Sequence, residues 1–140
     1  MSGDGSLPPI SANEWLARFV TVKGWIRADN TVRQDAFIPP RDLNLSVTRH
    51  LKLSQDQLWK IGQDVVDAIS EKHHAKLVGR ADLTVAAVAK TALRTDPAPI
   101  PKNPQHTHIA GWPTDKPTQK SIAQQLAAEA GFVAKEPLPA

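Results

Sequence analysis

The segment 103–113, NPQHTHIAGWP, restricts the fold more than any other part of the chain. It holds two of the 5 histidines and one of the 4 tryptophans, framed by prolines and a glycine that favour turns. The connector 96–104 that leads into it carries four prolines, so we expect an extended and stiff approach. Residues 108–110 are predicted to form a strand that ends at Gly111. The segment is therefore the first candidate for a functional site.

Several stretches have the pattern of short strands. Residues 18–26 are rich in β-branched and aromatic side chains, which suit a pleated surface. Residues 43–48 alternate apolar and polar side chains, the period of a strand with one buried face. Shorter extended pieces are predicted at 36–38, 77–83 and 92–95.

Two amphipathic helices are predicted, over 55–73 and 117–130, because apolar residues recur in each at a spacing of three or four. The first begins after Ser54, which has Gln57 three residues later in the spacing of a capping box. Thr114 or Asp115 caps the second. Shorter helical turns are predicted after the capping-box pair Ser11 and Glu14, as far as residue 17, and at 84–91.

Together these elements predict a single α+β domain over residues 11–133, with about four or five short strands and the two main helices packed on the sheet. A chain of 140 residues can bury a core of its own. Residues 1–10 are poor in apolar side chains, so we expect a flexible N-terminal tail there. Residues 134–140 are expected to form a frayed C-terminus.

Composition excludes several classes of protein. Without cysteine, the chain has no disulfide framework, thiolate zinc site or cysteine nucleophile. The net charge of +3 is spread evenly along the chain, which makes nucleic acid an unlikely partner. No apolar run approaches the length of a membrane span and no signal peptide is recognisable, so a cytoplasmic location without membrane contact is expected. No cofactor is expected.

His106 and His108 are the leading candidate ligand-binding residues. Residues two apart on a strand point to the same face, so both imidazoles are able to contact one ligand. A metal needs a third ligand from a distant residue, such as His50, His74 or Asp115, and the more common alternative is a half-buried His108 beside an exposed His106. We therefore predict no metal site.

Trp112 is a candidate aromatic wall for a ligand. The alternative is a core anchor whose indole N–H binds a carbonyl, and this alternative is favoured for a tryptophan between glycine and proline. Arg18, Ser46, Arg49 and His108 form a second group, with Arg80 as another source of charge. Their side chains converge on a phosphate if their strands are neighbours. The alternative is that these arginines are scattered over the surface.

No GxGxxG, GxxxxGK[ST], HExxH or GxSxG motif is present. Because no complete catalytic set is present, the first hypothesis is a non-enzymatic accessory module that binds another protein. The second hypothesis is an enzyme or sensor for a nucleotide or phosphorylated small molecule. In it, His108 is the acid/base or phosphate donor, Arg18 or Arg80 supplies charge, and Ser46 supplies a hydroxyl, with Trp112 as a stacking wall.

Three segments carry a resemblance: 37–47, the GRAD sequence at 79–82, and 103–113, which reads as NPxHxxIxGWP. With the alanine-rich helix that follows, they resemble small bacterial proteins over roughly residues 15–133. The resemblance implies a bacterial, stand-alone domain and carries no activity to transfer.

Overall fold

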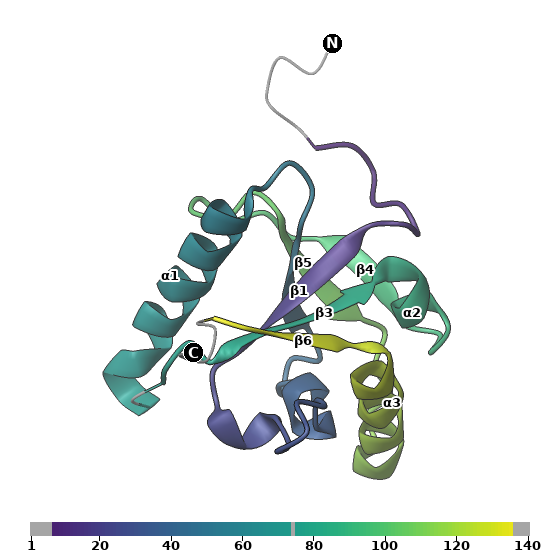
Figure 1. Ribbon diagram of the computed structural model, residues 1–140. Helices are drawn as coiled ribbons and strands as arrows, with labels where there is room; N and C mark the ends of the chain where they lie inside the picture. Colours follow the sequence, from purple (N-terminus) through teal and green to yellow (C-terminus); the bar gives the residue numbers. More distant parts are fainter. Residues whose placement is uncertain (1–6, 74, 136–140) are drawn as a thin grey trace.

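The computed structural model describes residues 7–73 and 75–135, and it is built on one six-stranded antiparallel sheet (Figure 1). The strand order is β4-β5-β2-β1-β3-β6. The strands are β1 (Trp15–Val20), β2 (Leu45–Arg49), β3 (Gly79–Thr84), β4 (Arg94–Pro97), β5 (His106–Ala110) and β6 (Gly131–Ala134). The helices are α1 (Gln55–His73), α2 (Val85–Ala89) and α3 (Lys116–Glu129), with short 3₁₀ helices η1 (Lys23–Trp25) and η2 (Gln34–Phe37).

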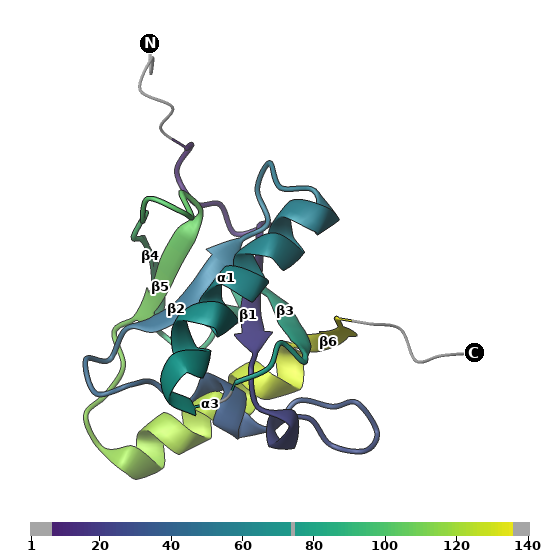
Figure 2. The ribbon, with the colours of Figure 1, turned by 90° about the vertical axis from the view of Figure 1, so that its left-hand side faces the viewer.

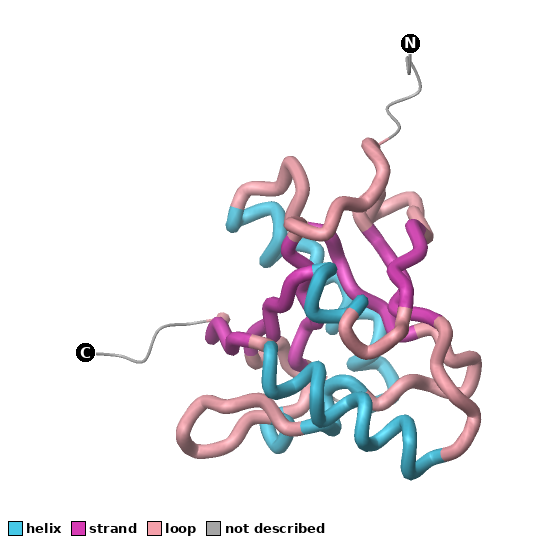
Figure 3. The backbone as a smooth tube through the Cα atoms, turned by 90° about the vertical axis from the view of Figure 1, so that its right-hand side faces the viewer, coloured by secondary structure: helices cyan, strands magenta, loops and turns pink. Residues whose placement is uncertain are grey.

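The sheet has a hydrophobic core on each face. Leu16 and Val20 of β1 pack into the larger core with α3 and η2, while Ala17 and Phe19 pack into a smaller core under α1. This division follows from the alternation of side chains along a strand. Figure 1 shows α1 on one side of the sheet, and Figure 3 looks onto the other side, where α2 and α3 lie. The predicted α+β class is confirmed, and the described residues form six strands and three α-helices where four or five strands and two main helices were predicted.

Helix α1 begins at the capping box that the sequence predicts. Gln57 N donates to Ser54 Oγ over 3.1 Å, and Ser54 N donates to Gln57 Oε1 over 2.8 Å, which is the predicted capping box. The helix has the predicted bounds of 55–73.

None of the helices in ranges 7–73 and 75–135 is long and apolar enough to cross a membrane.

The N-terminal prediction was wrong in its boundaries. Ser11 N donates to Glu14 Oε2 over 2.8 Å, but a strand and not a helix follows, because residues 15–20 pair along their whole length with β3. This pairing ends at Val20 opposite Gly79, and the chain then forms η1, so the predicted strand 18–26 stops early and Ile26 forms only an isolated bridge with Val32. Upstream, Pro8 O accepts a hydrogen bond of 2.9 Å from Arg49 Nη2.

Other segments also differ from prediction, and β4 covers 94–97 rather than 92–95 while β5 begins at 106 rather than 108. Residues 36–38 were expected to be extended, but η2 ends at Phe37 and buries Ala36 and Phe37 where it packs on α3. Residues 131–134 form edge strand β6 against β3, which adds a strand that local pattern did not predict. The predicted tail and frayed end fall partly on residues 1–6 and 136–140, which lie outside the described residues.

Segment 103–113 is built into the sheet. β5 pairs with β2 on one side and with β4 on the other, and Ile109 is fully buried. Gly111 has φ +89°, a conformation that favours glycine, and it turns the chain out of the strand. Trp112 is then buried in the larger core, and its Nε1 donates to Ile109 O over 3.0 Å. The core-anchor interpretation of Trp112 therefore agrees with the structure.

Candidate functional site

β1 and β2 separate after a short ladder, and the separation opens the sheet. They pair at Leu16 with Arg49 and at Ala17 with Thr48, whereas β2 pairs with β5 over four residue pairs. Arg18 follows directly after this ladder. Along β1 it belongs to the face of Leu16 and Val20, but its guanidinium occupies the gap between the two strands.

Arg18 is held by uncharged groups. Its Nε donates to Ala36 O over 2.8 Å, and its Nη1 donates to Ser46 O over 3.1 Å. The guanidinium carbon lies 5.6 Å from the ring centre of Trp25. Among the side chains of residues 7–69 and 75–135, no carboxylate forms an ion pair with Arg18. Its positive charge therefore has no counter-ion among these residues. The side chain is also half-buried, so water solvates the charge only in part.

Burial acts on this charge. It lowers the pKa of Arg18 to about 10, because a low-dielectric environment disfavours the charged form. The guanidinium is still protonated at neutral pH. A desolvated cation without a counter-ion gains more from an incoming anion than a solvated cation does.

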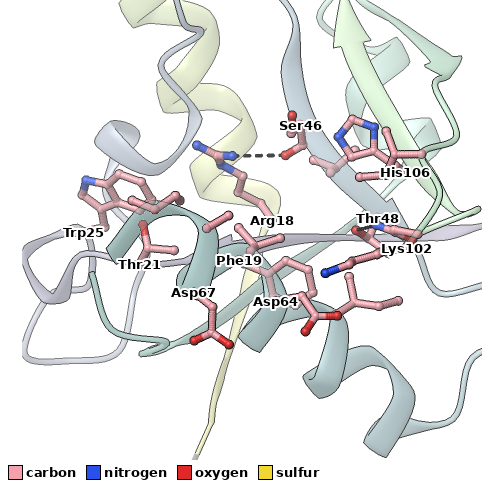
Figure 4. Close-up of a pocket in the computed structure, with 17 residues that line it drawn as sticks. Arg18, Phe19, Thr21, Trp25, Ser46, Thr48, Asp64, Asp67, Lys102 and His106 are labelled. Carbon is pink, nitrogen blue, oxygen red and sulfur yellow. Dashed lines mark hydrogen bonds between the residues drawn. The ribbon is translucent and has the colours of Figure 1, made fainter. Parts of the chain in front are cut away.

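Arg18 lines a cavity of about 670 Å³, a volume typical of small-molecule sites. The cavity lies between α1 and the part of the sheet where β1 and β2 separate (Figure 4). Figure 2 shows α1 crossing in front of the sheet while β4 and β5 extend beyond it. The wall is largely apolar, and its polar and charged side chains are Arg18, Thr21, Ser46, Thr48, Asp64, Asp67, Lys102, Asn103 and His106.

His106 contributes an oriented imidazole to this cavity. Its Nδ1 lies 2.7 Å from Ala98 O. Because a carbonyl only accepts, Nδ1 carries the hydrogen, and Nε2 of the neutral ring is left as an acceptor. His106 and His108 share a face as predicted, with ring centres 5.0 Å apart and edge to face. His108 lies opposite Ser46 in the ladder and is not part of the cavity wall.

Buried amide contacts fix the loop that carries Lys102. Asn103 Nδ2 donates to Thr48 Oγ1 over 2.9 Å, and Gln105 N donates to Asn103 Oδ1 over 3.1 Å. Asn103 and Thr48 are both almost fully buried. The end of the proline-rich connector is therefore tied to β2, which sets one rim of the cavity.

The structure separates the other predicted site residues from this cavity. Arg80 lies under α1, where its Nε binds Asp82 Oδ2 over 3.0 Å and its Nη2 donates to Gln55 Oε1 over 2.7 Å. Its guanidinium carbon also lies 4.6 Å from the ring centre of Trp59. Trp112 is in the core on the other face. Arg18, Ser46 and His106 are brought together, whereas His108, Arg80 and Trp112 are not.

The residues named as third metal ligands lie apart. His50 Nε2 is 3.1 Å from Asp82 Oδ1, and Asp115 accepts from Thr118 N at the start of α3. His74 lies outside the described residues. In ranges 7–69 and 75–135, no three His, Cys, Asp or Glu side chains are grouped to hold a metal ion.

Sequence reasoning missed Asp64, Lys102 and Trp25 as wall residues. Asp64 had no role in the sequence-based prediction of the site. A usable signal was its position three residues after Ile61, because side chains at this spacing are neighbours on a helix. Lys102 and Trp25 lie in loop and turn segments, where no periodicity predicts the orientation of a side chain.

No family model, curated protein or solved structure matches the chain.

Proposed function

We propose that the protein binds a small organic anion in the cavity beside α1, and that Arg18 receives the anionic group. The observation that carries this proposal is the uncompensated guanidinium in the cavity wall. Its Nε and Nη1 are engaged by backbone carbonyls, so Nη2 and the second hydrogen of Nη1 are left to donate to a ligand. Carboxylates and phosphoryl groups accept such bonds well.

The rest of the wall indicates that the ligand has an apolar body. Phe19, Ile61 and Val65 line the cavity close to the charged groups, and Trp25 adds an aromatic surface. A pocket of this kind buries apolar ligand surface and uses a few polar groups for orientation. This is the small-molecule hypothesis with changed residues, because His106 takes the place of His108 and Arg18 is the arginine of the site.

Binding of another protein is the second candidate function. β4 and β6 are the edges of the sheet, and edge strands offer unpaired backbone groups to a partner. Val133 on β6 and Ile100 beyond β4 are exposed apolar side chains. Light scattering and pull-down experiments that find a monomer without a partner count against this function.

Titration calorimetry with hexanoate and uncharged hexanamide tests the anion site. Hexanoate should bind measurably and hexanamide should not. R18Q, which retains a donor but no charge, should lower hexanoate affinity about 10- to 100-fold, the cost of a lost charge-assisted bond. R94Q is the matched control, because Arg94 is exposed and pairs with Asp96 on the edge strand.

R18K keeps the charge and should bind hexanoate better than R18Q does. Circular dichroism checks that each variant is folded. Equal binding of hexanoate and hexanamide, or equal losses in folded R18Q and R94Q, would overturn the proposal.

A further inference from the structure

The cavity wall holds a second charge without a partner, the carboxylate of Asp64. Asp64 lies in α1, is half-buried and lines the cavity that Arg18 lines. No hydrogen bond or ion pair joins it to another residue in the part of the chain that the structure describes. A half-buried carboxylate loses part of its hydration, and no donor among the described residues offsets that loss.

The other charged groups around Asp64 leave it unpaired. Asp67, one turn further along α1, accepts a bond of 2.9 Å from Gln63 Nε2. Lys102 also lines the cavity, and Figure 4 shows its ammonium on the same side as Asp64, but no ion pair within 4.0 Å joins the two side chains. Figure 4 shows Arg18 on one side of the cavity and both aspartates on the other, with Phe19 between them.

Two opposite charges therefore face one cavity without reaching each other. If Arg18 and Asp64 were in contact, they would form an ion pair, and they do not. A ligand with an anionic group at one end and an ammonium at the other satisfies both, and its apolar middle lies against Phe19. Each charge is then paired within a largely apolar wall.

We propose that the ligand is an amino carboxylate, whose carboxylate binds Arg18 and whose ammonium binds Asp64. This inference rests on the proposed function and names the substrate class for the same site. It differs from the phosphorylated ligand of the sequence hypothesis, because a phosphate ester without an amine leaves Asp64 unsatisfied.

The test compares 4-aminobutanoate, 6-aminohexanoate and 8-aminooctanoate with the alkanoates of the same chain length, by calorimetry on the full chain. At least one amino carboxylate should bind more tightly than its alkanoate. D64N should reverse this preference by lowering affinity for that amino carboxylate about tenfold or more, while the affinity for the alkanoate stays the same or rises. D56N is the matched control, because Asp56 is exposed in the first turn of α1 and outside the cavity.

The outcomes separate the two proposals. If alkanoates bind in an Arg18-dependent way but D64N changes both ligand classes equally, or neither, the amino carboxylate inference is overturned and the anion site stands. If no ligand depends on Arg18, both are overturned. Because no hydrogen bond or ion pair of the described residues depends on the Asp64 carboxylate, D64N should fold, and circular dichroism checks this.

Discussion

At the scale of single residues, Arg18 links the fold to the proposed function. Its guanidinium donates to Ala36 O and Ser46 O, so it closes the gap that opens where β1 and β2 part. The same side chain keeps an uncompensated charge on the cavity side. Arg49 is the opposite case, because it is 2% exposed and Glu14 neutralises it through two bonds.

The lowered pKa of Arg18 predicts a pH limit for anion binding. The group is charged below about 10 and loses its proton above it, so hexanoate affinity should be constant from about pH 7 to 9. At about pH 11 it should be roughly tenfold weaker, since one pH unit above the pKa leaves about a tenth of the group protonated. Hexanoate itself stays ionised throughout.

Calorimetry in the K102M background measures this limit, because that substitution removes the lysine ammonium from the cavity wall. Circular dichroism at each pH shows that the chain is folded. An affinity that is flat to pH 11 contradicts the assignment of the anion to Arg18.

The Glu14–Arg49 pair predicts an acid-sensitive contribution to stability. The hydrogen bond from Arg49 holds the pKa of Glu14 below its ordinary value. The pair therefore stabilises the fold fully above the ordinary pKa of a glutamate, and this contribution is lost as the pH falls through the lower folded value. E14Q should lower the free energy of unfolding at pH 7 by about 3 kcal/mol, because it leaves Arg49 buried and unpaired.

Urea denaturation at pH 7 and pH 3 checks this prediction, and the gap between E14Q and wild type should shrink at pH 3. E129Q is the control, because Glu129 and Lys90 form an exposed pair that contributes little. A gap that persists at pH 3 would assign the effect of E14Q to something other than its charge.

At the scale of elements, the sequence predicts those helices and strands whose limits depend on neighbouring residues in the chain. Helix α1 was predicted with its bounds, because Ser54, Gln57 and the apolar repeat all lie within the helix or next to it. β1 was misplaced, because its limits are set by pairing with β3, some sixty residues away. β6 depends in the same way on β3.

The cap of α1 gives a prediction at this scale. S54A removes the oxygen that accepts from Gln57 N, so the free energy of unfolding should fall by about 1 kcal/mol. S121A, an exposed serine inside α3, should cause no such loss, because alanine is the better helix former there. Urea denaturation of both variants provides the measurement, and equal effects would show that the capping box does not stabilise α1.

At the scale of the whole molecule, the cavity exists because α1 does not fill the space above the sheet where β1 and β2 separate. α1 covers one face of the sheet, and the sheet splits beneath it between β1 and β2. The sequence alone suggested that Arg18 and Ser46 belong together, and the structure brings them together through the Ser46 carbonyl rather than the hydroxyl. Asp64 escaped prediction because the face of a helix that meets a cavity depends on the other layer.

The central claim is that the Arg18 guanidinium has no counter-ion in the cavity wall and receives the anionic group of a ligand. The most direct measurement is the side-chain NMR signal of Arg18 Nε–H during titration with hexanoate, with Arg94 as the internal control. The account predicts a saturable shift of the Arg18 signal with hexanoate, none with hexanamide, and none at Arg94. An Arg18 signal that stays fixed, or that moves no more than the Arg94 signal, would contradict it.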